Sequence, residues 1–577
     1  MIYKMEVVKL IEQHTLLSAS EIEKLITSTP SIDVGDWAFP CFKLSKELKK
    51  APGLIAADLS ELMEANKPDF INKIQAVNGY VNIFLKREIV ASAVLTDIRA
   101  KAENYGGSDL GLGKTITIDY SSPNIAKHFH VGHFVTTVLG HSLYNILKFL
   151  GYHTVGINYL GDWGTQFGKL ISAYKRWGSK EAIEENGIDG LTELYVRFHK
   201  EAETDTELNA DARNWMLKMQ NGDDEALKLW KWFGEISLIE YERIYKRLNI
   251  TFDSYRGESH YNDKLDAIVA ELREKNLLVK SEGAMIVDLS EHNMPPCLIL
   301  RSDGGSLYPS RDIATALERK ENYNFYKSLY VTALDQKLHF AQWMKVVELM
   351  GYEWASDMYH IPYGLVLFKD GGKLSTRHGN VVKVEDLLDE AVSRVSVIIE
   401  EKNPDLPKKD VVAEQVGIGA LIFNQLYNNR IKDVQFDWDR LLNFDGETGP
   451  YVQYAVVRAN SVLKKVPPEI ANAYAPHARG DELIDYSQLC DSISYELINQ
   501  LALFPGRVIE AADKFEPYII SRYLVSLVHA FNKFYDTHKI LVDDQRIAIA
   551  RVALTQCVRD VLEKGLGLLC ITAPENM

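Results

Sequence analysis

Two histidines and a lysine within seven residues are the strongest candidates for chemistry in this chain. The stretch from Asp119 to His133 reads DYSSPNIAKHFHVGH, and it places Lys127 close to His130, Gly132 and His133. A strand that runs into a helix here would aim backbone N–H groups and a helix N-terminus at an anion such as phosphate. Imidazoles and an ammonium group beside that point could stabilise charge on a transferred phosphoryl or nucleotidyl group. Taken alone, HxGH is also typical of metal ligands or of ordinary surface histidines.

The residues around this stretch predict a β–α–β unit. β-Branched and polar residues alternate from Lys114 to Asp119, and apolar residues recur at helical spacing from Val135 to Leu150. A second apolar strand, Thr154 to Asn158, runs into LGDWGTQFG. Short loops between such elements indicate a parallel sheet of the Rossmann type, which binds ligands at the carboxyl ends of its strands. In that loop Asp162, Trp163 and Gln166 could be structural, but two such loops at one sheet edge favour a nucleotide site. Glycines there, such as Gly161, would let a ring or ribose approach the backbone.

A tyrosine and a carboxylate lie at the expected start of a later helix. Tyr308 and Asp312 are four residues apart, and Pro309 fits a first helical turn, so both side chains would face the same way. A hydroxyl beside a carboxylate suits a cationic guanidinium or ammonium group, whereas a helix cap with a surface acid is the structural alternative. Gln336 follows the strand expected at 329–333 and so also lies at a carboxyl strand end.

A glycine-rich basic loop follows the apolar strand expected at 361–368. It spans 369–382 (KDGGKLSTRHGNVV) and contains Lys373, Ser375 and Arg377. Such a loop could close over a triphosphate and neutralise it in the transition state. A solvated hairpin tip is the alternative.

The chain is long enough for about three to four domains, and its patterns predict a multidomain α/β protein. Residues 1–110 read as a separate α/β unit. Residues 111–390 read as the Rossmann-type domain, with a helical insertion at about 172–280. A helical connecting region (391–449) and an all-helical bundle (450–577) follow.

Aromatic residues mark two candidate surfaces for nucleic acid. In the hairpin expected around Asn78-Gly79, Tyr80 and Asn82 would share one face and could stack and hydrogen-bond an unpaired base. A structural sheet face is the alternative. Tyr451 and Tyr454 share a helix face in the bundle and could stack bases, with core packing as the alternative.

Composition points to a globular protein without a membrane segment. Of the 577 residues, 46% are hydrophobic and 25% are charged, and no run of about 18 apolar residues occurs. The net charge of −15 argues against non-specific nucleic-acid binding but allows a local RNA-binding surface. Without a CxxC pair or a signal-peptide core, we expect reduced thiols and a cytoplasmic protein. The cysteines are Cys41, Cys297, Cys490, Cys557 and Cys570.

Longer motifs are similar to those of one enzyme family. SPNIAKHFHVGH resembles the HIGH signature of class I aminoacyl-tRNA synthetases, and KLSTR resembles their KMSKS loop. The variants SSPNIAKHFHVGH, LGDWGTQFG and GPYVQYAVVRA, in this order and spacing, resemble those of arginyl-tRNA synthetases. The resemblance extends to the terminal GLGLLCITAPENM and covers essentially the whole chain. It implies that L-arginine is ligated to tRNA(Arg) at the expense of ATP, through arginyl-adenylate.

The resemblance also implies roles for the phosphate-binding residues. His130 and His133 would contact the ATP phosphates, and the loop with Lys373 would close over pyrophosphate. Thr376 stands where KMSKS has its second lysine, and Lys127 would supply the missing charge. We expect Mg²⁺ to be held mainly by the ATP phosphates, and no residue is assigned as a metal ligand. The other residues implied near ATP are Gly132, Gly161, Asp162, Gln166, Ser375 and Arg377.

Arginine would be recognised at both ends by this resemblance. Tyr308 and Asp312 fall where the family reads the guanidinium, and a carboxylate facing that planar fork discriminates against lysine. Asn124 and Gln336 match positions that hold the α-amino and carboxylate end. Asp119 matches a position that can be glutamate in relatives.

For tRNA, Tyr80 and Asn82 match the family's contact to an unpaired D-loop base. Tyr451, Tyr454 and Tyr535 match anticodon-facing aromatic residues, and Lys539 stands where the family has a tryptophan. Members generally need bound tRNA before they activate arginine, and we expect the same of this chain, acting as a monomer.

Two other functions compete with this interpretation. A small-molecule nucleotidyltransferase would also carry HxGH, but it leaves the N-terminal unit and the tyrosine-bearing bundle without a role. A non-catalytic, synthetase-like RNA-binding protein would not need the candidate site. Retention of Lys127, His130, His133, Tyr308 and Asp312 argues against it.

Overall fold

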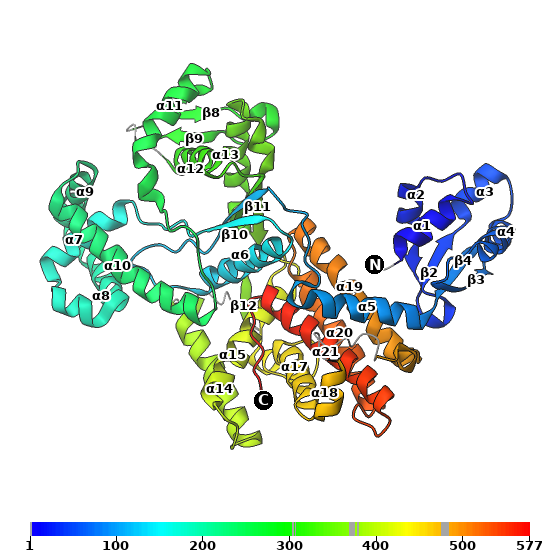
Figure 1. Ribbon diagram of the computed structural model, residues 1–577. Helices are drawn as coiled ribbons and strands as arrows, with labels where there is room; N and C mark the ends of the chain where they lie inside the picture. Colours follow the sequence, from blue (N-terminus) through cyan, green and yellow to red (C-terminus); the bar gives the residue numbers. More distant parts are fainter. Residues whose placement is uncertain (1–2, 303–304, 306, 369–375, 378–379, 475–483) are drawn as a thin grey trace.

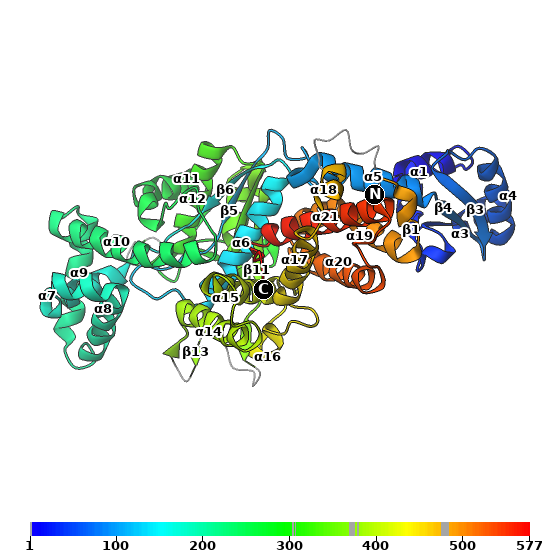
Figure 2. The same cartoon turned by 60° about the horizontal axis from the view of Figure 1, so that its bottom comes forward.

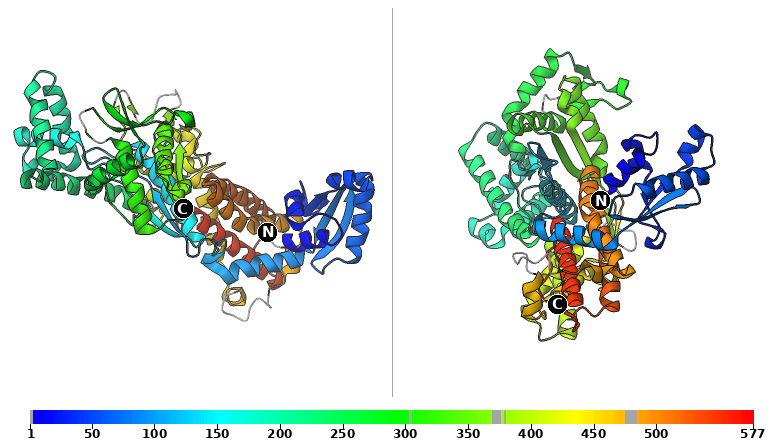
Figure 3. Two further views of the ribbon diagram at one scale, coloured as in Figure 1. Left: turned by 90° about the horizontal axis from the view of Figure 1, so that it is seen from above. Right: turned by 45° about the vertical axis from the view of Figure 1, so that its right-hand side comes forward.

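The computed structural model describes residues 3–302, 305, 307–368, 376–377, 380–474 and 484–577. The molecule is elongated (Figure 3), with the helices of the insertion at one end and the N-terminal unit at the other. The helical bundle lies between the N-terminal unit and the parallel sheet, as Figure 2 also shows. None of the helices in the described part of the chain combines the length and apolarity that a membrane crossing requires.

The N-terminal unit is a small sheet covered by helices (Figure 1). Its hairpin turns at Asn78-Gly79, as expected, and both residues have positive φ (49° and 84°), which suits a two-residue turn. Pro52 opens a helix in its first turn, where its missing N–H costs nothing. The strand order is β1-β2-β4-β3. The elements are α1 (Lys4–Glu12), α2 (Ala19–Leu25), β1 (Thr27–Ser28), β2 (Trp37–Pro40), α3 (Phe42–Leu48), α4 (Pro52–Ala65), β3 (Ile71–Val77) and β4 (Tyr80–Leu85).

The central sheet confirms the expected parallel Rossmann-type arrangement. Its order is β11-β10-β5-β6, and all three pairings are parallel. Buried strands such as β5 have both faces covered by helices, which explains their continuous β-branched character. The elements are β5 (Thr115–Asp119), α6 (Val131–Phe149), β6 (His153–Ile157), α12 (Tyr308–Tyr323), β10 (Lys327–Ala333), α13 (Lys337–Leu349) and β11 (Met358–Tyr363).

The expected helical insertion follows β6 and returns through a small antiparallel sheet. Phe233 is fully buried and Trp215 is 7% exposed, so these aromatic residues pack the helical core rather than line a ligand site. The elements are α7 (Thr165–Trp177), α8 (Lys180–Glu201), α9 (Thr206–Gln220), α10 (Asp224–Arg247), α11 (Leu265–Glu274), β7 (Leu278–Ser281), β8 (Ala284–Val287) and β9 (Cys297–Leu300).

The C-terminal part is helical, as expected. The helix α5 (Arg87–Lys101) follows the N-terminal sheet but packs against α19 and α21 of the bundle. Two short strand pairs accompany these helices. They are β12 (Val366–Phe368) with β15 (Val434–Phe436), and β13 (Thr376–Arg377) with β14 (Asn380–Val381). The helices are α14 (Val384–Lys402), α15 (Lys409–Leu426), α16 (Trp438–Leu441), α17 (Gly449–Leu463), α18 (Pro468–Tyr474), α19 (Ser492–Lys514), α20 (Tyr518–Thr537) and α21 (Gln545–Leu568).

Candidate active site

The two histidines of the HVGH motif form the first turn of α6. The helix begins at Val131, four residues before the expected start, because His130 and His133 cap it. His130 Nδ1 accepts a hydrogen bond from the Gly132 N–H at 3.1 Å, and His133 Nδ1 accepts one from the His130 N–H at 3.2 Å. The two rings stack with centroids 3.7 Å apart. The helix N-terminus therefore lies at the carboxyl end of β5, where an anion would be stabilised.

Both imidazoles are held in the neutral form. Burial lowers the pKa of His130 and of His133, and the positive charge of Lys127 lowers both further. Because each Nδ1 accepts a backbone hydrogen bond, the proton of each neutral ring is on Nε2. The motif thus offers two Nε2–H donors to a ligand, rather than two unprotonated nitrogens to a metal ion.

The second signature loop is joined to the first at its base. His130 forms an antiparallel bridge with Lys383, and the Val384 N–H donates to the Phe129 carbonyl at 2.8 Å. Thr376 and Arg377 pair with β14 just before this bridge, so the expected proximity of the loops is present in the backbone. Lys373 and Ser375 lie outside the described residues, and only the backbone of Arg377 is described.

The loop after β6 contacts the loop after β5. Gly161 pairs with Asn124 in a parallel bridge, and a Cβ at Gly161 would lie 2.3 Å from Asn124 Oδ1, which explains the glycine. Gln166 Nε2 donates to the Gly161 carbonyl at 3.3 Å. The carboxylate of Asp162 instead accepts from the Ser259 N–H (2.8 Å) and Oγ (2.6 Å). Asp162 thus has a structural partner for each carboxylate oxygen. The sequence allowed a structural role for Asp162 but did not indicate Ser259 as its partner.

A buried ion pair occupies Asp119 at the end of β5. The Arg319 guanidinium lies 2.8 Å from Asp119 Oδ2, and the Ser122 hydroxyl donates to Oδ1 at 3.0 Å. Asp119 is 7% exposed and Arg319 only 2%. Burial raises the pKa of Asp119, and Arg319 opposes that shift. The expected arginine contact of Asp119 stays a prediction, and its carboxylate already has a cationic partner.

Asp312 lies on α12, the helix that also carries Arg319, and it faces the region around Asp119. Its Oδ2 is 2.6 Å from His339 Nε2. Its negative charge is one of the causes that raise the pKa of Asp119 and of Glu258. His339 is three residues after Gln336, which is exposed at the end of β10 as expected. Asp119, Asp312 and Gln336 therefore lie around the carboxyl ends of the central strands.

Tyr308 lies at the mouth of this region. It is 66% exposed and lines a cavity of about 650 Å³ together with Trp163, Glu258 and Arg311. The Arg311 guanidinium donates to Glu258 at 3.1 Å, while burial raises the pKa of Glu258 to about 7. The cavity thus adjoins the acidic groups that would receive a cationic side chain.

Sequence reasoning missed the partners that hold the acids. Arg319 is seven residues after Asp312, so helical spacing places it on the same face of α12. That spacing was a usable signal. His339 gave no such signal, because its contact with Asp312 depends on how α12 and α13 pack against each other. Among the described residues, no group of three or more His, Cys, Asp and Glu side chains could hold a metal ion.

The residues expected to bind tRNA lie outside the central parallel sheet, on the N-terminal unit and on the helical bundle. Tyr80 is 38% exposed and meets Phe42 edge-on, with ring centroids 5.2 Å apart. Asn82 is only 7% exposed, because the loop around Gly35 covers it. In this structure the Asn82 amide is therefore mostly buried while the Tyr80 ring is open, and the tRNA contact of both residues stays a prediction.

The three tyrosines of the bundle lie around one arginine. The Arg458 guanidinium is 5.1 Å from the ring centroid of Tyr454 and 4.8 Å from that of Tyr535. Asn532 receives a hydrogen bond from Arg458 (2.7 Å) and donates one to the Tyr451 hydroxyl (3.0 Å). Tyr454 and Tyr535 are 40% and 37% exposed. The two helices α17 and α20 thus present a cationic, aromatic surface, of which Arg458 and Asn532 were not predicted.

The fold and the site define a class of protein. Residues 94–438 match the catalytic domain of class I tRNA synthetases (R), which agrees with the parallel sheet and the two joined signature loops. This chain is a class I tRNA synthetase. Residues 3–85 match the arginyl-tRNA synthetase N-terminal domain and residues 452–577 the DALR anticodon-binding domain.

Similar proteins specify the family. An arginine–tRNA ligase of Alkaliphilus metalliredigens is 49% identical over 557 residues, which are 96% of each chain. That of Halothermothrix orenii is 48% identical over 576 residues and the full length of both chains. The solved arginyl-tRNA synthetase of Thermus thermophilus superposes over all of both chains with a TM-score of 0.80 at 26% identity. The chain belongs to the arginyl-tRNA synthetase family.

Proposed function

We propose that this chain ligates L-arginine to tRNA(Arg) in two steps and uses its bound tRNA for the first. The arginine carboxylate attacks the α-phosphate of ATP, which releases pyrophosphate and forms arginyl-adenylate. A hydroxyl of the tRNA 3′-terminal ribose then attacks the arginyl carbonyl, and AMP leaves. The observation that carries this proposal is the meeting of the histidine turn, the base of the second loop and Asp312 around one sheet edge.

Phosphate activation is assigned to the neutral donors of the histidine turn and to the positive charge of Lys127 beside them. The Nε2–H groups of His130 and His133 donate to phosphate oxygens as negative charge develops, and Lys127 adds a positive charge. Two neutral rings can stack at 3.7 Å without the repulsion that two imidazolium ions would suffer. Lys373 and Arg377 close over the pyrophosphate from the second loop. Mg²⁺ is a further component of the proposal, held mainly by the ATP phosphates.

Arginine recognition is assigned to Asp312 and Tyr308. A carboxylate has about four acceptor sites, so Asp312 can bind a guanidinium beside His339. Tyr308 would cover the guanidinium from the cavity side, and Asn124 with Gln336 would hold the amino-acid end. The compact lysine ammonium cannot bond in the same bidentate way, which gives discrimination.

The proposed tRNA contacts lie on the N-terminal unit and on the helical bundle. Tyr80 would stack on a D-loop base, and the surface of Tyr451, Tyr454 and Tyr535 would receive the anticodon. We also propose a cytoplasmic enzyme that acts as a monomer, since one chain carries both tRNA surfaces and the active site.

The assay that tests the proposal is ATP–pyrophosphate exchange with purified tRNA(Arg). We expect exchange only when L-arginine and tRNA are both present, and none with lysine. Exchange with arginine alone would contradict the tRNA requirement. Exchange with another small-molecule substrate, or none under any condition, would contradict the ligase itself.

The Tyr454→Ala variant should bind tRNA(Arg) less tightly. Base stacking on an aromatic residue contributes about 1–3 kcal/mol, so we expect the KM for tRNA to rise about 5- to 150-fold. The KM for arginine should not change, because Tyr454 lies on the bundle. Tyr326→Ala is the control. Tyr326 is about as exposed as Tyr454 (42%), but it lies beside the amino end of β10 in the catalytic domain, outside the tyrosine surface of the bundle. An equal rise in both variants would contradict the assignment of this surface.

A further inference from the structure

The loop that carries Asn124 and Lys127 has an unusually strained backbone. Ser121, Ser122 and Ala126 all have positive φ (73°, 51° and 60°), although none is glycine. Each such residue costs about 1–3 kcal/mol and persists only where surrounding groups impose it. The groups that impose this conformation are therefore part of what makes the site competent.

One face of the insertion helix α10 supplies those groups. Ser237, Tyr241 and Tyr245 follow each other at intervals of four, and all three are buried. The Ser237 hydroxyl accepts from the Ala126 N–H at 3.0 Å. Tyr245 bonds the Ser121 hydroxyl at 2.7 Å and accepts from the side chain of Asn158 at 3.0 Å.

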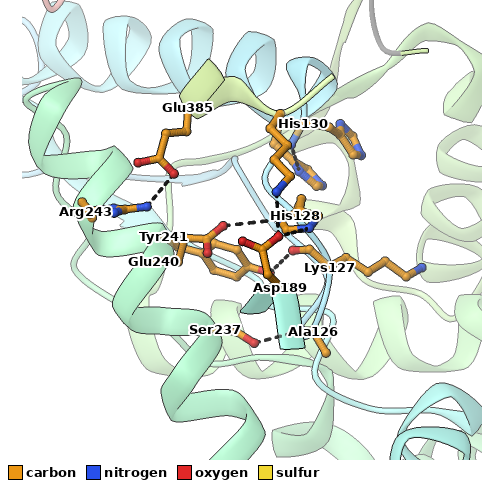
Figure 4. Close-up of polar contacts among 12 residues, drawn as sticks. Ala126, Lys127, His128, His130, Asp189, Ser237, Glu240, Tyr241, Arg243 and Glu385 are labelled. Carbon is orange, nitrogen blue, oxygen red and sulfur yellow. Dashed lines mark hydrogen bonds and ion pairs between the residues drawn. The ribbon is translucent and has the colours of Figure 1, made fainter. Parts of the chain in front are cut away.

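Tyr241 makes the most direct contact with the candidate catalytic residues. Its hydroxyl lies 2.7 Å from the carbonyl oxygen of Lys127 (Figure 4). It also lies 2.7 Å from the carbonyl oxygen of Asn124. A phenol has one proton, so this proton is shared between two carbonyl oxygens at the two ends of one turn. In Figure 4 the Lys127 side chain extends away from Tyr241, whereas the Lys127 backbone carbonyl is bonded by the Tyr241 hydroxyl.

We propose that Tyr241 is a positioning residue for the reaction, which fixes the turn 124–127 so that Asn124 and Lys127 project into the active site. The turn has little support of its own. Ile125 is held by the Gly161 carbonyl, but the carbonyls of Asn124 and Lys127 both depend on the Tyr241 hydroxyl. Without that proton, two carbonyl dipoles would face each other across a partly buried site, and the turn would open to separate them.

The inference rests on the proposed roles of Asn124 and Lys127. It assigns a positioning role to Tyr241, a residue of the helical insertion that belongs to neither signature motif. It also gives the helical insertion a catalytic purpose. Its helix α10 acts as a template for a loop whose conformation the sequence of the loop does not favour.

The test is Tyr241→Phe, which removes only the hydroxyl. A displacement of about 1 Å can cost about 100-fold in rate, and we expect kcat for arginine activation to fall at least about tenfold. The control is Tyr523→Phe. Tyr523 is 4% exposed and also donates to a backbone carbonyl, that of Gln500 at 3.0 Å, but within the bundle. An unchanged kcat, or an equal loss in the two variants, would overturn the inference.

Two further measurements separate positioning from simple stability. In a Lys127→Ala background the cost of Tyr241→Phe should shrink to about threefold, because contacting residues are not additive. A full tenfold cost there would overturn the inference. Amide hydrogen exchange over 121–127 should be faster in Tyr241→Phe than in Tyr523→Phe, whether or not the protein ligates arginine. Unchanged exchange would overturn the inference, whereas an inactive wild type would contradict only the proposed function.

Discussion

The Lys127→Ala variant should form arginyl-adenylate about 100- to 1,000-fold more slowly than the wild type, the loss typical when one donor to a developing charge is removed. Lys127 is exposed at the strand-end turn, and its charge lowers the pKa of both His130 and His133. Thr376 cannot supply a positive charge from the second loop. Removing Lys127 therefore leaves two neutral imidazoles as the donors of the first loop.

The measurement is ATP–pyrophosphate exchange at saturating tRNA, with kcat and the KM for arginine determined separately. We expect kcat to carry the loss, since the charge is needed in the transition state rather than for arginine binding. Lys127→Arg should recover part of the rate because it keeps the charge.

Lys169→Ala provides a matched control. Lys169 and Lys127 both lower the pKa of His199, so the two lysines lie in one neighbourhood, but Lys169 is on α7. Its removal takes away the same charge without touching the turn. A loss of similar size in Lys169→Ala, or less than about a threefold loss in Lys127→Ala, would contradict the assigned role, because removal of a transition-state donor should lower the rate far more.

Sequence patterns predicted the scaffold well because period and order determine it. The alternation in 114–119 and the apolar run in 154–158 specified two parallel strands, and the dipeptide Asn78-Gly79 specified the hairpin. The strand-end loops followed from topology alone, since parallel strands place their carboxyl ends at one edge. Lys127, His130 and Asp312 could therefore be placed near this edge without knowledge of tertiary contacts, and their roles stay predictions.

Contacts between distant segments could not be predicted in this way. The start of α6 at Val131 depends on histidines acting as caps, which is not a usual role of that residue. The burial of Asn82 depends on a loop more than 40 residues earlier in the chain. Tyr241 lies 114 residues from Lys127, and nothing in the local sequence of either indicates that they meet.

Arg319→Met should destabilise the catalytic domain by about 3–5 kcal/mol, because it leaves the buried Asp119 carboxylate without its partner. Both side chains are nearly inaccessible, and the rings of Tyr159 and Tyr330 lie 5.4 and 5.5 Å from the guanidinium. Methionine keeps much of the packing volume among these rings. The loss is therefore expected to be electrostatic, and a lowered thermal midpoint without substrates would measure it.

The pH dependence of that loss distinguishes an orphaned charge from poor packing. Burial raises the folded-state pKa of Asp119, and Arg319→Met removes the positive charge that opposes this rise. An acid with a raised folded-state pKa contributes stability that is full below its unfolded value, about 4, and is lost as the pH rises through the folded value. The deficit of Arg319→Met should thus be smaller at about pH 5 than at about pH 8. The double variant Asp119→Asn with Arg319→Met should recover most of the stability at both pH values, since no buried charge remains. A deficit that is independent of pH and persists in the double variant would show that Arg319 acts through packing, and Asp119 would then be free to bind substrate.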